Sequence, residues 1–291
     1  MNDILQETKF LMKKYKIKPN KSLGQNFLID SNVLENIVGC SNINNEDLVI
    51  EIGPGLGTLT KYLIEKAGKV ICVELDNSMI NILHDRFKLY KNIEILHEDI
   101  LKLDLNDLIA KEKSTKNIKS VKIVANLPYY ITTPIIMKLL ESKLDLDCIT
   151  VMIQKEVADR LIAIPGEKLT GAITYAVYYY SEAQGIMEVP KNSFVPAPEV
   201  TSKVIKLNIR KSPIVKVRNE KLMFEIIKSA FMQRRKTLLN ALTNTKVFAN
   251  KEEGCKILET MGLDINIRPE KLTLDDFAGI TNILIASYLK K

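Results

Sequence analysis

Positions 126–130 read Asn-Leu-Pro-Tyr-Tyr and follow an apolar run that is typical of a strand. The pentad could activate the exocyclic amine of a nucleobase, which is a poor nucleophile because its lone pair is delocalised into the ring. Hydrogen bonds to two acceptors favour the tetrahedral nitrogen that can attack, and we interpret the Asn126 side-chain oxygen and the Leu127 carbonyl as these acceptors. Pro128 stiffens the turn, and Tyr129 offers a ring face for an extruded base. The motif therefore predicts Asn126, Leu127, Pro128 and Tyr129 as catalytic residues.

A glycine-rich turn at 53–57, Gly-Pro-Gly-Leu-Gly, follows another apolar run at 48–52. Such a turn between a strand and a helix lets a nucleoside or a phosphate approach the main chain. The dinucleotide fingerprint GxGxxG would require glycine at position 58, where Thr58 stands. This departure favours S-adenosylmethionine over a nicotinamide dinucleotide, with Gly53 and Gly55 at the cofactor. The reaction indicated is methyl transfer to a base amine, an in-line displacement in which positioning carries most of the catalysis.

Acidic residues follow the next two strand-like runs. Glu74, with Leu75 beside it, ends the second run, where a carboxylate can accept the hydrogens of a ribose diol. Asp76 is the competing candidate, but it lies past the strand and could cap the following helix. After the third run, Asp99 could accept a hydrogen bond from an adenine amino group, with Ile100 packed on the ring.

Strand-like and helical runs alternate through the first half of the chain. The expected strands cover 48–52, 69–74, 93–96, 121–125 and 148–152, and the expected helices cover 58–66, 78–87, 105–111 and 134–141. Alternation of this kind indicates right-handed crossovers and a mostly parallel sheet covered on both faces. The fold class expected is therefore α/β.

The pattern changes towards the C-terminus. Residues 154–180 look helical, and the strand-like runs 184–189 and 202–209 could pair as an antiparallel hairpin at the sheet edge. After Ser212-Pro213 the only runs are helical, at 221–231, 236–242, 251–261 and 275–289. We therefore expect an α/β domain over 1–211 with a basic N-terminal arm, and a small all-helical domain over 212–291.

Composition narrows the class of protein. Hydrophobic residues at 46% and charged residues at 26% are ordinary for a globular chain. No apolar run approaches the ~20 residues that span a bilayer, and the N-terminus has no apolar signal segment, so a cytoplasmic protein is expected.

The four cysteines show no CxxC spacing and there are two histidines. They fit buried thiols in a reducing compartment and predict no metal site.

The net charge of +7 is spread unevenly. Residues 9–21 hold six lysines and no acid, residues 203–221 hold seven Lys or Arg against one acid, and Arg234-Arg235-Lys236 follow. Basic clusters around a candidate base-modifying core favour a nucleic acid partner. We predict that Arg234, Arg235 and Lys236 contact RNA phosphates, and that segment 9–21 is a mobile arm that becomes ordered on RNA.

Five segments together resemble the small-subunit rRNA adenine dimethyltransferases of the KsgA type. They are 21–28, 51–55, 126–130, 154–157 and 233–236. The resemblance implies a class I, Rossmann-like S-adenosylmethionine-dependent methyltransferase sheet with its last strand antiparallel, and a helical C-terminal domain. It implies conversion of two adjacent adenines near the 3′ end of 16S rRNA to N6,N6-dimethyladenosine in the assembling 30S subunit, with a role in ribosome biogenesis.

The resemblance also implies further site residues by motif match. It places Asn26 and Leu28 at the cofactor, together with Gly53, Glu74, Asp99 and Asn126. Gly55, Leu75 and Ile100 complete the cofactor contacts that we expect. The resemblance makes Phe194 the second stacking face for the target base, whereas the residues alone describe Phe194 as an exposed aromatic on a stiff, proline-rich loop. The expected partner is 16S rRNA within the 30S subunit or its precursor. A monomer is expected, because nothing indicates an obligate dimer.

Three alternatives remain open on the sequence. A related family dimethylates 23S rRNA and confers macrolide resistance; the Asn-Leu-Pro-Tyr-Tyr form and the Gln-Arg-Arg-Lys segment favour the small-subunit family. An RNA-binding factor for small-subunit assembly would use the same basic segments. A DNA adenine methyltransferase is disfavoured because such enzymes typically carry proline where Leu127 stands.

Overall fold

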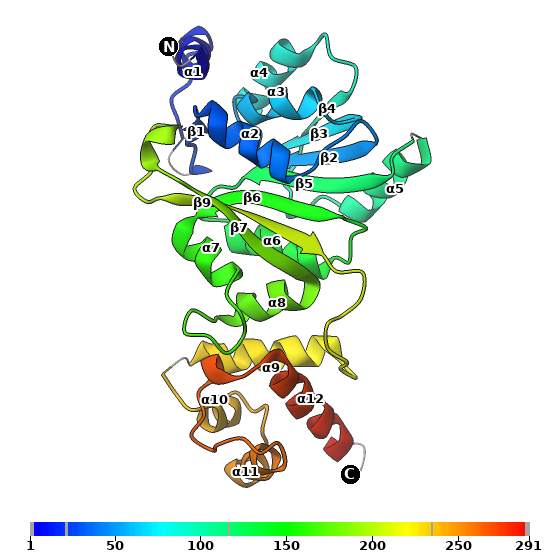
Figure 1. Cartoon of the computed structure of the whole chain (residues 1–291), viewed down its shortest axis with the longest axis vertical. Coiled ribbons are helices and arrows are strands. Elements are labelled where there is room, and N and C mark those ends of the chain that lie inside the picture. Colours follow the sequence, from blue (N-terminus) through cyan, green and yellow to red (C-terminus); the bar gives the residue numbers. More distant parts are fainter. Residues whose placement is uncertain (1–2, 21–22, 116, 234, 289–291) are drawn as a thin grey trace. The chain divides into compact units, whose positions relative to one another are not determined.

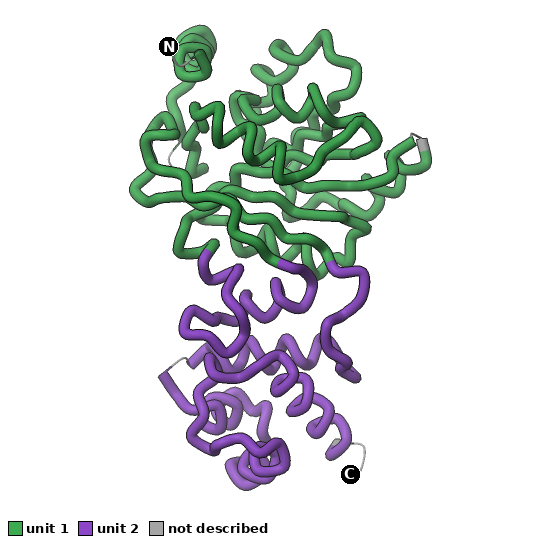
Figure 2. Tube along the Cα trace, viewed as in Figure 1, with its two compact units in different colours: residues 1–158, 183–209 green, residues 159–182, 210–291 purple. Residues whose placement is uncertain are grey.

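The chain forms two compact units in its computed structural model, which describes residues 3–20, 23–115, 117–233 and 235–288. Unit 1 comprises Met1–Ala158 and Ala183–Ile209, and unit 2 comprises Asp159–Glu182 and Arg210–Lys291 (Figure 2). None of the helices described is long and apolar enough to cross a membrane.

Unit 1 is built on a mixed sheet. Its strands are β2 (Asp47–Ile52), β3 (Lys69–Glu74), β4 (Ile93–His97), β5 (Ser120–Asn126), β6 (Cys148–Gln154), β7 (Ser181–Val189) and β9 (Ser202–Ile209). Their spatial order is β4-β3-β2-β5-β6-β9-β7. Strands β2 to β6 pair in parallel, and β9 runs antiparallel to β6. This confirms the expected mostly parallel sheet and places β9 and β7 side by side at its edge.

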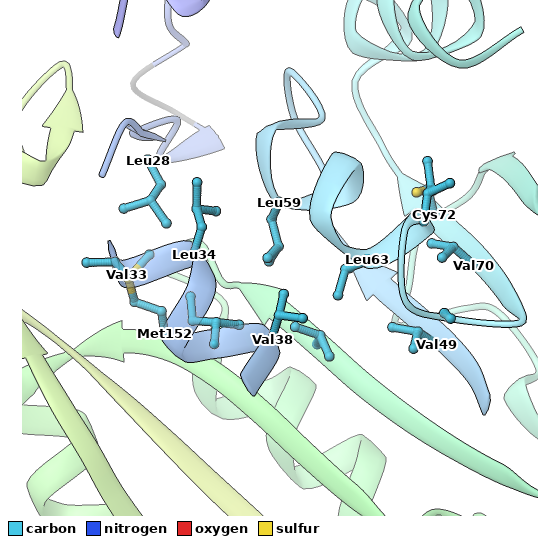
Figure 3. Packing of buried hydrophobic residues seen from close by; sticks show 14 of the residues in the cluster. Leu28, Val33, Leu34, Val38, Val49, Leu59, Leu63, Val70, Cys72 and Met152 are labelled. Atoms are coloured by element: carbon cyan, nitrogen blue, oxygen red, sulfur yellow. The ribbon is translucent and has the colours of Figure 1, made fainter. Parts of the chain in front are cut away.

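Helices cover both faces of this sheet, as near-continuous apolar strands require. On one face lie α2 (Ser31–Cys40), α3 (Thr58–Ile64) and α4 (Asn77–Phe87), and on the other lie α5 (Leu105–Thr115) and α6 (Thr132–Glu141) (Figure 1). Leu34 of α2 and Leu59 and Leu63 of α3 belong to one buried cluster with Val49 and Val70 of the sheet (Figure 3). This packing holds the strand ends, and the loops that follow them, at fixed positions.

Helix α1 (Asp3–Lys14) corrects one expectation, because the basic N-terminal segment is not an unstructured arm over these residues. Its Leu11 is buried in a cluster with Leu56 and Met79. Glu7 lies 2.5 Å from the Arg86 guanidinium. Sequence reasoning considered only the charges of this segment and missed the apolar face that packs it against the sheet domain. Lys21, the last lysine of the predicted arm, lies outside the described residues.

Unit 2 is helical, with a short 3₁₀ turn at Pro269–Lys271. Its helices are α8 (Ala172–Tyr180), α9 (Glu220–Met232), α10 (Leu238–Asn244), α11 (Lys251–Thr260) and α12 (Leu274–Tyr288), and the short α7 (Lys155–Leu161) spans the division between the units. The helical unit takes up the chain again at Arg210, whereas the expected boundary lies near residue 211, and it also contains residues 159–182, which the sequence placed in the α/β domain. Tyr175 explains the difference: it is fully buried in the core of unit 2 and donates a 2.7 Å hydrogen bond to the Leu272 carbonyl.

Candidate active site

The carboxyl ends of the parallel strands border a pocket in unit 1, as expected for an open α/β sheet. Every residue predicted at the cofactor, at the reacting amine or on a stacked base lines this pocket. These residues are Asn26, Leu28, Gly53, Gly55, Glu74, Leu75, Asp99, Ile100, Asn126, Leu127, Pro128, Tyr129 and Phe194. Residues that are far apart in the sequence thus converge on one space.

The glycine turn after β2 leaves its main chain open to the pocket. Gly53 and Gly55 have φ angles of 67° and 57°, in the left-handed region that favours glycine. A Cβ at Gly53 would meet no atom within 4 Å, so open space lies beside the backbone there. The Gly55 amide donates a 3.1 Å hydrogen bond to Glu74 Oε2, which fixes the turn against the end of β3.

Glu74 lines the pocket, whereas Asp76 does not. Glu74 is 8% exposed, and its Oε1 accepts hydrogen bonds from the amides of Leu75 and Asp76 at 2.8 and 2.9 Å. Burial raises the pKa of Glu74, although these main-chain donors oppose the shift. Asp76 instead caps α4 by accepting from the Ser78 amide at 2.9 Å. Since each carboxylate oxygen has two acceptor positions, Glu74 Oε2 can accept a further donor.

The loop after β4 and the residue after β3 supply a partly apolar part of the pocket lining. Asp99 Oδ1 accepts a 2.9 Å hydrogen bond from the Leu101 amide, which holds the start of this loop. Ile100 is buried, whereas Leu75 is 52% exposed although it is a large apolar residue. Leu75 and Ile100 could therefore contact the faces of an aromatic ring, with a carboxylate close by.

Asn126 ends β5, and its amide is held at the pocket. Its Nδ2 donates to the main-chain carbonyl of Asn26 at 3.3 Å, and within the described residues its Oδ1 has no hydrogen-bond partner. The Leu127 amide donates to the Met152 carbonyl at 3.1 Å, and Thr132 Oγ1 donates to the Pro128 carbonyl at 3.0 Å. The turn is therefore anchored at both ends, with one acceptor oxygen left available.

Phe194 corrects a second expectation, because it is 3% exposed and not an exposed loop aromatic. It lies in β8 (Phe194–Val195), which pairs antiparallel with β1 (Phe27–Leu28) so that Phe194 faces Leu28. Tyr129 is half-buried, and its hydroxyl lies 2.7 Å from Ser202 Oγ. Burial raises the pKa of Tyr129, so its hydroxyl stays protonated at neutral pH.

Sequence reasoning missed two polar residues at this pocket. Glu51, near the end of β2, is 2% exposed and accepts a 2.6 Å hydrogen bond from the Thr60 hydroxyl; burial raises its pKa to about 7. Gln25 donates to Asp76 at 2.8 Å and ties the segment before β1 to the end of β3. A lone glutamate within an otherwise apolar strand was the available signal for Glu51.

The predicted RNA contacts fall in unit 2, between α9 and α10. Arg234 lies outside the described residues, and Arg235 and Lys236 are exposed. No group of three or more His, Cys, Asp or Glu in the described part of the chain is arranged to hold a metal ion.

The sequence over residues 16–286 matches the ribosomal RNA adenine dimethylase family. This chain belongs to that family. It is 48% identical over 280 residues to the ribosomal RNA small subunit methyltransferase A of Alkaliphilus metalliredigens, with 96% of each chain covered. The crystal structure of a dimethyladenosine transferase from Plasmodium falciparum is similar, with a TM-score of 0.73, 26% identity and coverage of 91% of this chain and 98% of the other.

The structure of the 23S rRNA methyltransferase ErmE is also similar, with a TM-score of 0.67 and 20% identity over 89% of this chain and all of the other. At that identity the likeness concerns the fold alone. These comparisons confirm the expected Rossmann-like methyltransferase fold with a helical C-terminal region. They also confirm the enzyme class, an S-adenosylmethionine-dependent rRNA methyltransferase.

The residues that line the pocket fit S-adenosylmethionine. The open backbone at Gly53 admits a ligand, the Glu74 carboxylate can accept from hydroxyls, and Leu75 and Ile100 are suited to a purine. The bound cofactor supplies an electrophilic methyl group on a cationic sulfur.

Proposed function

We propose that this protein dimethylates the N6 amines of two adjacent adenosines near the 3′ end of 16S rRNA, in the assembling 30S subunit, and thereby takes part in ribosome biogenesis. The observation that carries the proposal is the free Oδ1 of Asn126 in the pocket that Gly53 and Glu74 also line. The identity to small subunit methyltransferase A supports the choice of substrate. We further propose that the protein acts in the cytoplasm as a monomer.

The chemistry proposed for the Asn126 turn is activation of the amine. Asn126 Oδ1 and the Leu127 carbonyl each accept one N–H of the adenine amine, so that the nitrogen lone pair leaves conjugation with the ring. The nitrogen then forms a bond to the methyl carbon, the carbon–sulfur bond breaks, and its electron pair stays on sulfur. The excess proton on nitrogen leaves to water. Tyr129 and Phe194 stack on the extruded base and hold it in line.

The cofactor contacts are proposed on the same pocket. Glu74 accepts from the ribose hydroxyls, Asp99 accepts from the adenine amino group, and Leu75 and Ile100 pack on the adenine ring. The main chain at Gly53 and Gly55 borders the remainder of the cofactor. Asn26, Leu28 and Asn126 complete the site.

Glu74→Gln should raise the dissociation constant of S-adenosylmethionine roughly tenfold, because it removes a charge-assisted acceptor for the ribose. Asp76→Asn is the matched control. Because asparagine caps a helix as well as aspartate does, the dissociation constant of S-adenosylmethionine for the Asp76→Asn variant should stay within about twofold of the wild-type value. Isothermal titration calorimetry measures both. A larger loss of affinity for Asp76→Asn than for Glu74→Gln would show that Asp76, and not Glu74, binds the ribose.

We also propose that Arg234, Arg235 and Lys236 contact rRNA phosphates. Replacing all three by glutamine should reduce the slope of log affinity against log salt by roughly 2–3, at about 0.7–0.9 per lost contact. Filter binding to 30S subunits over a salt series measures the slope.

The control for that experiment removes the same charge elsewhere. Lys66, Lys88 and Lys91 are exposed lysines of unit 1, and replacing them should leave the slope nearly unchanged. If the two triple variants changed the slope equally, residues 234–236 would contribute only through the net charge of the protein and not through contacts of their own.

A transfer assay with tritiated S-adenosylmethionine tests the proposed function itself. It compares 30S subunits that lack the dimethyladenosines with 23S rRNA and duplex DNA. Label at two adjacent 16S adenines as N6,N6-dimethyladenosine is expected. Label on 23S rRNA alone would move the protein to the macrolide-resistance type, whose fold it shares. Binding to 30S subunits without any label would favour an assembly factor.

A further inference from the structure

The hydroxyl of Tyr129 meets a serine that belongs to a distant part of the chain. Ser202 is fully buried at the first position of β9, and its Oγ lies 2.7 Å from the Tyr129 hydroxyl. Ser202 is opposite Gln154 in the pairing of β9 with β6, and the neighbouring Thr201 carbonyl accepts from the Lys155 amide at 3.0 Å. The serine is therefore held by the sheet and offers a fixed partner to the half-buried ring.

Ser202 is also one end of the segment 194–202, whose other end is Phe194. Phe194 is fixed by the β1–β8 pairing, and Ser193 before it donates to Asp30 Oδ2 at 2.9 Å. Pro196 and Pro198 restrict the backbone between the two ends. One anchored segment thus supports the two aromatic residues proposed to stack on the target base, Phe194 directly and Tyr129 through a hydrogen bond.

We propose that Ser202 is a positioning residue that holds the Tyr129 ring in place to stack on the target adenine of the RNA; this rests on the function proposed above. A tyrosine side chain can adopt several rotamers, and the hydrogen bond to Ser202 favours the one rotamer of Tyr129 that permits it. The segment 194–202 then sets the separation of that ring from Phe194.

The second methyl transfer depends on this positioning more than the first. An unmodified amine has two N–H groups, one for Asn126 and one for the Leu127 carbonyl. After the first transfer it has one N–H and a methyl group, so it can satisfy only one of the two acceptors. Stacking must then supply more of the orientation, and a loosened Tyr129 slows the second transfer more than the first.

Ser202→Ala tests the proposal in single-turnover reactions on 30S subunits, with nucleosides identified by mass spectrometry. The ratio of the second transfer rate to the first should fall roughly five- to tenfold, the size expected for one hydrogen bond, so that N6-methyladenosine accumulates. Tyr129→Phe removes the same hydrogen bond and should give a similar ratio. Because both changes act on one contact, the double variant should be little worse than either single variant. Ser202→Thr, which keeps the hydroxyl, should restore much of the second transfer.

Ser41→Ala is the matched control for the loss of a buried serine hydroxyl. Ser41 is fully buried in the same unit and its Oγ pairs with the Thr150 hydroxyl at 2.8 Å, but it does not line the pocket. Its ratio of second to first transfer should equal that of wild type, even if the protein is less stable. Failure of the wild type to form dimethyladenosine would refute the proposed function. An active wild type with an unchanged ratio in Ser202→Ala, or additive losses in the double variant, would refute the role of Ser202.

Discussion

Asn126→Ala should lower the rate of methyl transfer to 30S subunits by roughly 100- to 1000-fold, the loss typical of removing one preorganised hydrogen-bonding group from a transition state. The physical reason is that Asn126 Oδ1 is the side-chain acceptor that frees the amine lone pair. Single-turnover kinetics with saturating S-adenosylmethionine measures the step directly.

Asn92→Ala is the control for the cost of losing a partly buried asparagine. Asn92 Nδ2 donates to the carbonyls of Ile64 and Ala67 at 3.0 and 3.1 Å, as Asn126 Nδ2 donates to that of Asn26, but Asn92 does not line the pocket. Its variant should lose stability and keep its rate. If Asn126→Ala stayed within about threefold of Asn92→Ala, main-chain acceptors alone would activate the amine.

Asn126→Asp separates the two functions of the side chain. Aspartate keeps the acceptor oxygens but cannot donate to the Asn26 carbonyl, which would instead face a second oxygen. We expect a rate of methyl transfer between those of wild type and Asn126→Ala.

The affinity of Asn126→Ala for 30S subunits should be close to that of wild type. Such a result would separate catalysis from any role in assembly.

The cofactor side of the pocket could be predicted from the sequence because its residues follow a local rule. Gly53, Glu74 and Asp99 each stand at or just past the end of a strand-like run, and parallel strands bring their carboxyl ends to one edge. Glu74 was preferred to Asp76 because Asp76 lies past the expected strand, a choice that depends on where β3 ends. The structure ends β3 at Glu74 and uses Asp76 as the cap of α4.

The residues that sequence reasoning misplaced depend on contacts between distant segments. Phe194 is buried because the two-residue strands β1 and β8 pair with each other, although most of the sequence of unit 1 lies between them. Strands this short carry no periodic signal. Helix α8 joins the helical unit because Tyr175 and Tyr179 pack there, although the change in composition comes later in the chain. The burial of Leu11 in α1 likewise depends on partners such as Met79 that lie far away in sequence.

Glu51 should make the stability of unit 1 depend on pH. Its pKa is 4.5 in its unperturbed state and about 7 in the folded protein, because burial disfavours the charged form. The groups that contact or face it are Thr60, Cys72 and the like-charged Glu74, and none of them is a cation.

The sign of the effect follows from proton linkage. Well below pH 4.5 the carboxyl is neutral in both states, and its burial costs no ionisation energy. As pH rises to about 7 the unfolded chain ionises first, so the free energy of unfolding falls, and it levels off above the folded pKa. The total loss is on the order of 3 kcal/mol, from about 1.4 kcal/mol per pKa unit.

Glu51→Gln isolates this contribution from all other titrating groups. Urea unfolding followed by circular dichroism, for both proteins at a series of pH values, gives the difference in free energy of unfolding. The difference should be small near pH 4 and should grow in favour of the glutamine variant up to about pH 8, by on the order of 3 kcal/mol. A difference that stays constant over this range would mean that the pKa of Glu51 is the same in the folded and the unfolded protein. Thr60 and Cys72 would then stabilise its charge by as much as burial opposes it.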